Sequence, residues 1–328
     1  MLLHKEFLQN KKNLLAFSAG VDSTALLFLL LENNIHFDIA IVDYGLREES
    51  KDEVAYAKEL AKENNFTCHV YKAQEIQTNF EAQARKIRYD FFEELIQEHN
   101  YVNLLTAHHL GDRFEWMLMQ FCKGAGCVEL SGMQVIDKRD QYTLLRPLLH
   151  LEKEELLLYL SRNKIRYFED SSNDDEKYKR NEFRHNYAKP LLKKYLSGIK
   201  KSFEYLDEDV KQLVSAVSLS RCNKLVYFKS SESKRSDIIA IDKYFKSIGK
   251  LITAGEKALL KEQSTVIISR DYVVNQKHSY VCIAPFLKAE NMDKELKEEL
   301  RLLKIEPKLR GYLASDSEAL EFLSLLLQ

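Results

Sequence analysis

The first half of the chain alternates short apolar runs with helical patterns, and this alternation is the strongest constraint on its fold. Strands and helices that follow one another at this spacing are typical of βαβ units, whose right-handed crossovers build a parallel sheet. The expected strands are residues 13–18, 38–43, 67–72, 102–108 and 142–148. The expected helices are residues 23–33, 50–64, 80–99, the third of them capped by Asn79, and 112–122. We therefore expect an α/β fold with a Rossmann-like parallel sheet.

Beyond residue 149 the pattern becomes mostly helical, with an amphipathic helix at residues 152–162 and a polar loop at residues 170–175. A lysine- and arginine-rich segment at residues 177–201 and a helix at residues 203–218 follow. Short mixed elements come last, at residues 224–228, 238–241, 265–269 and 280–284. A chain of 328 residues is long for one core, so we expect two domains. Residues 1–200 would hold the parallel sheet and a helical extension, and residues 201–328 a small α+β domain.

Composition restricts the functional class only weakly. Hydrophobic residues make up 45% and charged residues 30%, as in a soluble globular protein. A formal net charge of −1 does not indicate a nucleic-acid binder, so any such surface must be local. The sequence has no signal peptide and no apolar stretch long enough to span a membrane, which predicts a cytoplasmic protein. The five cysteines include no C-x-x-C pair, so we expect free thiols.

A loop of small residues, F-S-A-G-V-D-S-T-A-L at positions 17–26, joins the first expected strand to the first helix. Such a turn brings backbone N–H groups close to an anion, and the helix N-terminus favours negative charge. Ser18 and Ser23 add hydroxyl donors, and Asp22 offers a hard oxygen suited to Mg²⁺. Neither G-x-x-x-x-G-K-[ST] nor G-x-G-x-x-G is present. A phosphate-binding loop is favoured over a plain strand–turn–helix connection.

Polar clusters follow the first, second and fourth expected strands, at residues 18–23, 42–47 and 106–115. In an open parallel sheet, ligands bind beyond the carboxyl ends of the strands, so the three clusters predict one site. Asp112 and Glu115 are three residues apart at a helix start and share a face. They could hold Mg²⁺, bind an ammonium group or act as bases, or merely complement the helix dipole.

Histidine and arginine side chains extend this candidate site. His108 could orient a phosphate or move a proton, although a structural role stays open. A zinc site formed by His108, Asp112 and Glu115 is also open on ligand type. His109 is expected to face the other way. Arg85 and Arg88 share a helical face and could bind a carboxylate or a phosphate, or simply face solvent.

Together these segments resemble the tRNA(Ile)-lysidine synthetase (TilS) family of the PP-loop ATP pyrophosphatase superfamily. The resemblance covers most of residues 13–190, in the expected order. The matching motifs are S-A-G-V-D-S (18–23), V-D-Y-G-L-R (42–47), E-A-Q-A-R-K-I-R-Y (81–89), T-A-H-H-L-G-D-R-F-E (106–115), K-G-A-G-C-V-E-L-S-G-M (123–133), R-P-L-L (146–149) and E-D-S-S-N-D-D-E-K-Y-K-R-N-E-F-R-H (169–185). The first motif is typical of the superfamily, and the others narrow it to the family.

The resemblance implies two reactions in one site. ATP adenylates the wobble cytidine of a tRNA(Ile) with a CAU anticodon, and the amine of free L-lysine then displaces AMP. The product, lysidine, pairs with adenosine, so the codon read changes from AUG to AUA. ATP and Mg²⁺ are the implied cofactors, the C-terminal domain is expected to bind tRNA, and a homodimer is left open.

The resemblance also implies roles for individual residues. The pyrophosphate end of ATP would lie on Ser18, Ala19, Gly20, Val21, Asp22 and Ser23, with Asp22 on Mg²⁺. The base and the lysine would be surrounded by Arg85, His108, Asp112 and Glu115, and Asn181 and Arg184 match the R-N-x-x-R pattern near the tRNA side. The departures from the family pattern are Ala19, Tyr44, Gly111, Trp116 and Glu129. Of these, Ala19 could narrow the approach to phosphate, and Trp116 and Glu129 could reshape the base pocket.

Three alternatives remain. A PP-loop tRNA thiolase would need cysteines near the site, and Cys122 and Cys127 are the candidates. A non-catalytic tRNA-binding protein could keep the fold, but the intact Asp22, Asp112 and Glu115 argue against it. A small-molecule amidotransferase is disfavoured by the basic segment at residues 177–201 and by the extra C-terminal domain.

Overall fold

The computed structural model describes residues 2–45, 49–74, 76, 78, 80–168, 179–214, 217–231, 233–277, 279–288 and 292–327. Contacts within the chain divide it into two compact units, Met1–Asp207 and Glu208–Gln328. Several predicted features lie outside the described residues: Leu46 and Arg47, the helix cap at Asn79, the loop at 170–175 and the first ten residues of the motif at 169–185. Among the described residues, no helix is both long and apolar enough to cross a bilayer.

A six-stranded sheet forms the centre of the first unit, in the order β3-β2-β1-β4-β6-β5. Its strands are β1 (Asn13–Ala16), β2 (Phe37–Asp43), β3 (Cys68–Lys72), β4 (Asn103–Leu105), β5 (Ile136–Lys138) and β6 (Thr143–Leu145). All neighbours are parallel except β5 and β6. This confirms the predicted parallel sheet and adds β5, an antiparallel edge strand that was not predicted. Because the strand order reverses between β1 and β4, a ligand site is expected beyond their carboxyl ends.

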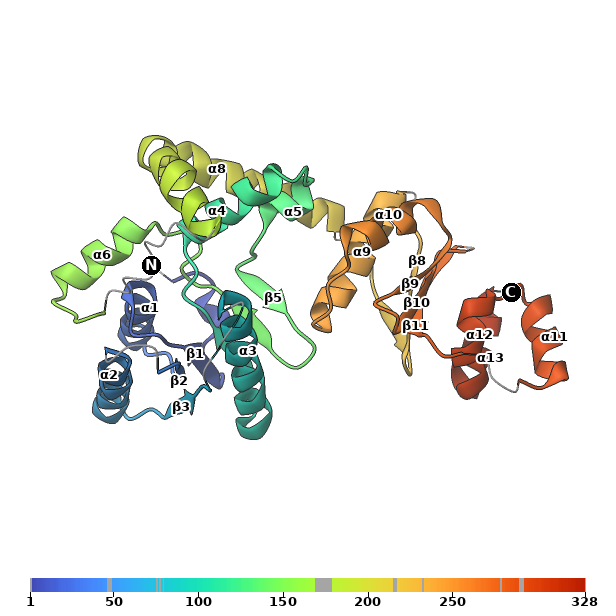
Figure 1. Ribbon diagram of the computed structural model, residues 1–328, viewed down its shortest axis with the longest axis horizontal. Helices are drawn as coiled ribbons and strands as arrows, with labels where there is room; N and C mark the ends of the chain where they lie inside the picture. Colours follow the sequence, from blue (N-terminus) through green and yellow to red (C-terminus); the bar gives the residue numbers. More distant parts are fainter. Residues whose placement is uncertain are drawn as a thin grey trace. The chain divides into compact units, whose positions relative to one another are not determined.

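Helices cover both faces of this sheet (Figure 1). They are α1 (Val21–Glu32), α2 (Glu49–Asn64), α3 (Phe80–His99) and α6 (Lys153–Arg162), and the short helix η1 (Lys5–Phe7) precedes β1. Alternate strand residues point to opposite faces, as the pleat requires. Leu15, Ile39 and Leu105 pack with α1, α2 and α6 in one core, whereas Leu14 and Leu104 pack with α3 in another.

The remaining helices of the first unit gather beyond the strand ends. They are α4 (Leu110–Phe121), α5 (Cys127–Ser131), α7 (Lys179–Phe183), the π-helical turn η3 (Arg184–Ala188) and α8 (Lys189–Val214), which belongs to this unit up to Asp207. Buried Arg113 braces three of them: its Nε donates to the Ser131 carbonyl at 3.0 Å, and its guanidinium pairs with Asp207 and lies over the Phe203 ring. These Arg113 contacts fix the position of α4, the helix that carries Asp112 and Glu115.

The second unit is built on a separate antiparallel sheet, β7-β8-β11-β10-β9. Its strands are β7 (Ser220–Cys222), β8 (Leu225–Lys229), β9 (Thr265–Ile268), β10 (Tyr272–Asn275) and β11 (Tyr280–Pro285). The helices α9 (Lys234–Ser247) and α10 (Ala254–Glu262) cover one face, and α11 (Lys294–Leu302), α12 (Pro307–Ser315) and α13 (Ser317–Leu327) pack on the other (Figure 1). The expected α+β character is confirmed.

One expected short element of this unit, at residues 238–241, is part of a longer helix. Residues 238–241 belong to α9, although their Ile-Ile-Ala-Ile sequence resembles a strand. The helix begins after Ser233, whose hydroxyl accepts the Ser236 N–H, and it buries Ile238, Ile241 and Phe245 at helical spacing against the sheet. The cap and the three-to-four-residue period therefore outweigh the β-branched composition.

Candidate functional site: two clusters at the carboxyl ends of β1 and β4

The loop after β1 is a closed turn held by its own hydroxyls. Ser23 Oγ lies 3.1 Å from Ser18 Oγ, accepts the Ser18 N–H at 3.2 Å and donates to the Gly20 carbonyl at 3.2 Å. Gly20 is the N-cap of α1, so Val21, Asp22 and Ser23 form its first turn. The first N–H groups of a helix have no partner within the helix and are suited to an anion. The sequence motif thus folds into a turn that could cradle phosphate.

Ala19, which stands where the superfamily motif has glycine, adopts the left-handed conformation with φ of 58°. It is fully buried in the core beneath the loop, so its methyl group faces the protein interior. The Ala19 carbonyl accepts the Phe168 N–H at 2.9 Å, and Gly20 forms a β-bridge with Phe168. Ala19 therefore preserves the turn that glycine would make, and the expectation that it narrows the approach to phosphate is wrong.

Asp22 has the chemistry that a divalent cation requires. Its Oδ1 atom is buried and accepts no hydrogen bond among the described residues. Burial raises the pKa of this carboxyl, while the neighbouring His109, Lys153 and Arg184 oppose the rise. Within the described ranges, no three His, Cys, Asp or Glu side chains are grouped as a metal site. An ion here would take one protein ligand and complete its shell with phosphate oxygens and water, as Mg²⁺ commonly does.

His109 joins the two clusters and was missed by the sequence analysis. It caps α4: its backbone N–H donates to Asp112 Oδ2, and its Nδ1 accepts the Gly111 N–H, both at 3.0 Å. The ring proton therefore lies on Nε2, which is 3.9 Å from Asp22 Oδ2 and 3.6 Å from Asp112 Oδ2. The expectation that His109 faces away from the site is wrong, because α4 begins at Leu110, two residues earlier than predicted.

Gly111, another departure from the family pattern, makes this histidine orientation possible. A Cβ atom at position 111 would lie 2.6 Å from His109 Cε1 and 2.9 Å from its Nδ1. Real Cβ atoms do not approach other atoms so closely, so any larger residue would displace the ring. The cap formed by His109, in this orientation, therefore requires glycine at position 111.

Asp112 and Glu115 are both covered by arginines from α7 and η3. Arg180 donates to Asp112 Oδ1 at 2.7 Å and to Glu115 Oε2 at 3.2 Å, and Arg184 Nε donates to Glu115 Oε1 at 2.7 Å. Glu115 is only 3% exposed. Burial alone would raise the pKa of Asp112, but His109, His108 and Arg180 outweigh it and hold that pKa well below its usual range. The pair is a buried anionic site that already binds two cationic side chains.

His108 lies on the same side of the sheet edge and is neutral near pH 7. Burial lowers its pKa to about 4; the Asp112 carboxylate opposes this shift, and the positive charges of Arg146 and Arg180 add to it. Its Nδ1 is 2.9 Å from Thr106 Oγ1. A neutral imidazole can accept a proton, which an imidazolium cannot.

Arg85 and Arg88 are both exposed on α3. The Arg85 guanidinium lies over the Tyr89 ring, 4.8 Å from its centroid, and its charge contributes to lowering the pKa of His108. Arg85 is therefore close enough to the site to act on it electrostatically, while its head group stays accessible.

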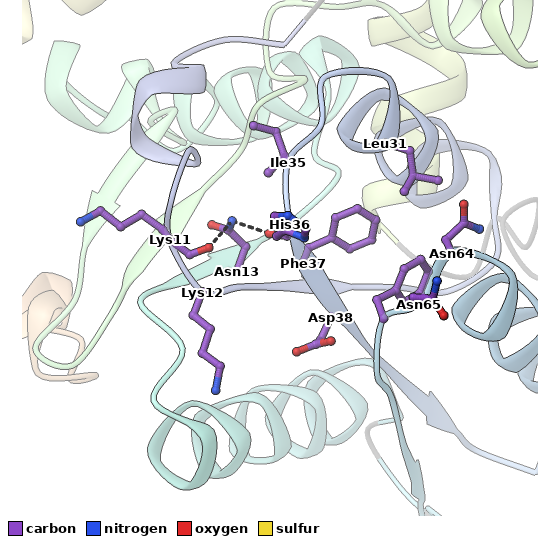
Figure 2. Close-up of a pocket in the computed structure, with 11 residues that line it drawn as sticks. Lys11, Lys12, Asn13, Leu31, Ile35, His36, Phe37, Asp38, Asn64 and Asn65 are labelled. Atoms are coloured by element: carbon purple, nitrogen blue, oxygen red, sulfur yellow. Dashed lines mark hydrogen bonds between the residues drawn. The ribbon is translucent and has the colours of Figure 1, made fainter.

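At the opposite, amino-terminal edge of the same sheet lies a hollow of about 250 Å³. Figure 2 shows the Asn13 amide there, directed at main-chain oxygens. It donates to the carbonyls of Lys11 and His36 at 3.0 and 2.7 Å. The Asp38 carboxylate accepts the Thr67 N–H and the Tyr101 hydroxyl, each at 2.6 Å. The Asn13 amide and the Asp38 carboxylate, which line this hollow, are thus already engaged in hydrogen bonds within the protein.

Comparison with known proteins finds a matching family, similar sequences and a similar fold. A PP-loop domain family matches residues 2–191. A tRNA(Ile)-lysidine synthase of Helicobacter pylori is 40% identical over 316 residues, covering 95% of this chain and 92% of the relative. The synthase of Wolinella succinogenes is 42% identical over 312 residues, covering 95% of each. A U34-tRNA thiolase from Methanococcus maripaludis, 18% identical, has a similar fold, with a TM-score of 0.52 over 64% of this chain and 76% of its own.

Proposed function

Because this chain belongs to the PP-loop family of tRNA(Ile)-lysidine synthases, we propose that it joins lysine to the wobble cytidine of tRNA(Ile). It is an ATP-dependent ligase, as its high-coverage relatives indicate. The observation that carries the proposal is the approach of Asp22 and Asp112 to the same atom, His109 Nε2, at 3.9 and 3.6 Å. This contact joins the phosphate loop and the carboxylate pair in one site.

In the first step, the cytidine carbonyl oxygen attacks the α-phosphorus of ATP. A carbon–oxygen–phosphorus linkage forms, the bond between the α-phosphorus and the bridging oxygen breaks, and pyrophosphate leaves. The turn at residues 18–23 would hold the departing pyrophosphate through its N–H and hydroxyl groups. Mg²⁺ bound at Asp22 would neutralise charge on the phosphates.

In the second step, the lysine amine attacks the activated ring carbon, a carbon–nitrogen bond forms and AMP leaves. Asp112 and Glu115 would bind the lysine ammonium groups in place of the Arg180 and Arg184 guanidinium groups that they contact now. The freed arginines could then bind the lysine carboxylate or tRNA phosphates. His108, neutral near pH 7, could accept a hydrogen bond from the attacking amine. The proton that the amine releases would leave to water, because a pKa of about 4 makes this imidazole a weak base.

The tRNA would be bound partly by α8. Exposed Tyr195 and Tyr205 on this helix each lie beside a lysine, Lys194 at 5.2 Å and Lys201 at 4.8 Å from the ring centroids. Lysines with interleaved aromatic rings suit a nucleic-acid backbone and its bases. We assign tRNA binding to the second unit as well, and the cytoplasm as the place of action. If α8 binds phosphates, tRNA affinity should fall steeply with salt, and a flat response would contradict this part.

The test is incubation of the full chain with tRNA(Ile) transcript, ATP and labelled lysine, scoring label retained on RNA. The matched control is the same transcript with the wobble cytidine replaced by uridine. We expect label only with ATP and cytidine, together with release of AMP and pyrophosphate. Equal labelling of both transcripts, or none of either, would overturn the proposal.

The thiolase alternative receives no support from the cysteines. Cys122 follows α4 and Cys127 begins α5. Among the described residues, no metal-binding cluster includes either of them. Likeness to the Methanococcus maripaludis thiolase shows the fold alone. Replacing both cysteines by serine should leave lysine incorporation unchanged, and a loss of incorporation would count against the assignment made here.

A further inference from the structure

Trp116 is an exposed aromatic residue next to the carboxylate pair. It follows Glu115 directly and lies one helical turn after Asp112, so the Asp112 and Trp116 side chains are neighbours on the surface of α4. Its exposed fraction is 45%, although Glu115 beside it is 3% exposed. A large indole ring therefore borders the candidate site and remains accessible to a ligand.

The backbone of Gly132 holds this ring in place. A Cβ atom at position 132 would lie 2.7 Å from Trp116 Cδ1 and 3.4 Å from Nε1, closer than the indole could tolerate without moving. Gly132 also has φ of 65°, a conformation that residues with side chains rarely adopt. The turn after α5 thus requires glycine for two reasons, and one edge of the indole rests against it.

Two cationic side chains lie beside the neighbours of the ring. Arg180 pairs with Asp112 and Arg184 with Glu115, so positive charge that could bind RNA phosphate is close at hand. Isolated exposed apolar residues are common and need no special explanation. Trp116 differs from them because it combines accessibility, a glycine-backed position and direct neighbours that we assign to the reaction.

We propose that Trp116 is the stacking platform for the pyrimidine base that is modified. This inference rests on the proposed function and names the residue that orients its nucleic-acid substrate. A base that stacks on the indole would lie within one helical turn of Asp112, where the attacking amine is expected to bind. Base–aromatic stacking contributes enough binding energy to matter for an unpaired nucleotide.

The chain offers a direct readout, because Trp116 is its single tryptophan. Intrinsic fluorescence of the full chain, excited at the red edge of tryptophan absorption, therefore reports on this ring alone. We expect quenching by tRNA(Ile) transcript, and little quenching by the same transcript with an abasic wobble position. Equal quenching by both RNAs, or a spectral change on concentrating the protein without RNA, would overturn the proposal, the latter indicating an interface between copies.

Three variants separate stacking from simple packing. W116L keeps apolar volume but loses the ring, and should raise the tRNA KM for adenylation about 5- to 150-fold. W116F keeps a ring and should retain most activity. The matched control is F121L, which replaces a 65% exposed ring about 140° further round α4 and should behave as wild type. Unfolding temperature is measured for each, so that loss of fold is recognised.

The outcomes distinguish the two proposals. If wild type incorporates lysine and W116L matches it in KM, stacking is wrong and the function stands. If wild type incorporates no lysine but its fluorescence still depends on the wobble base, the stacking contact stands and the assigned reaction fails. A W116L defect that W116F shares in full would also contradict stacking.

Discussion

The two edges of the N-terminal sheet differ in how their polar groups are satisfied. At the amino edge, the Asp38 carboxylate has a partner for each oxygen, the Thr67 N–H and the Tyr101 hydroxyl. At the carboxyl edge, Asp22 Oδ1 is buried without a partner among the described residues. Both edges hold acids and histidines, but among the described residues only the carboxyl edge keeps a buried carboxylate oxygen without a partner.

This difference shows that a hollow by itself does not identify a site. The amino edge contains a hollow of about 250 Å³, yet its lining forms internal hydrogen bonds that stabilise the fold (Figure 2). Buried unsatisfied polar atoms cost free energy, so a protein that retains one has a structural or functional reason to do so. The carboxyl edge is accordingly the place where we expect ligands.

The largest expected effect separates Asp22 from Asp38. Asp22→Asn should lower tRNA adenylation about 10²- to 10³-fold, because charge stabilisation of the leaving pyrophosphate through Mg²⁺ is lost. Asp38→Asn at the other edge should leave the rate nearly unchanged and cost about 1 kcal/mol of unfolding free energy. Pyrophosphate release and urea unfolding measure the two effects. Wild-type adenylation by the Asp22 variant would remove the assigned role.

A second contrast concerns histidine protonation and stability. His108 has its pKa lowered to about 4 in the folded chain, from 6.5 for an unperturbed histidine. Between these values the unfolded state binds the proton and the folded state does not, so stability falls as pH decreases through this window. The loss attributable to His108 should reach about 3 kcal/mol near its folded pKa. Urea unfolding across this range should show a flatter profile for His108→Gln.

The matched control is His69 at the amino edge. Burial also lowers its pKa, and His99 adds to the shift, but the side chain is only half-buried. His69→Gln should therefore flatten the profile less than His108→Gln. Equal flattening by the two variants would mean that burial affects the pKa of His69 as much as that of His108, so the two edges would not differ in this respect.

The third effect is on lysine use. Glu115→Gln removes the negative charge at a position that binds Arg180 and Arg184 now and would bind an ammonium group during the reaction. Lysine KM should rise roughly tenfold or more, as for loss of a charge-assisted hydrogen bond, while adenylation falls less. Glu155→Gln, which breaks a partly exposed pair with Lys200, is the control and should change neither step. Equal loss of both steps in the Glu115 variant would contradict this division.

Much of the fold could be predicted because its signals are local. Alternating strand and helix patterns predicted the parallel sheet, and the rule that ligands bind beyond parallel strand ends brought residues 18–23 and 106–115 together. The short strand β5 was missed because its sequence, Ile-Asp-Lys, contains one apolar residue and no apolar run. The short element expected at residues 238–241 is part of the longer helix α9, which the Ser233 cap and the spacing of Ile238 and Ile241 indicate.

The site was less predictable where contacts are distant in sequence. Arg180 and Arg184 reach Glu115 across more than sixty residues, and only their four-residue spacing indicated that they share a helical face. His109 could have been found: a histidine three residues before Asp112 fits a capping box once the helix start is moved to Leu110. Its orientation toward Asp22 depends on tertiary packing and had no local signal.

The smallest expected effect concerns the turns at the two edges. Left-handed positions at the amino edge are filled by asparagine, as at Asn34 with φ of 53°, whereas the carboxyl edge uses Ala19 with φ of 58°. Left-handed backbone costs an alanine about 1–2 kcal/mol. Ala19→Gly relieves this cost but has two destabilising effects. Glycine gives the unfolded chain more conformational freedom, which lowers the unfolding free energy by about 0.4–1 kcal/mol, and the lost buried methyl group lowers it by about 0.8 kcal/mol. The terms nearly cancel, so unfolding free energy should change by less than about 1 kcal/mol, and the ATP KM should stay constant because the methyl faces the core.

Asn34→Ala, which creates the same strain on an exposed turn with no burial to offset it, should destabilise the chain by about 1 kcal/mol. Urea unfolding of both variants decides the matter: if Ala19→Gly stabilises the chain by clearly more than 1 kcal/mol, backbone strain in the phosphate loop outweighs the packing of its methyl group.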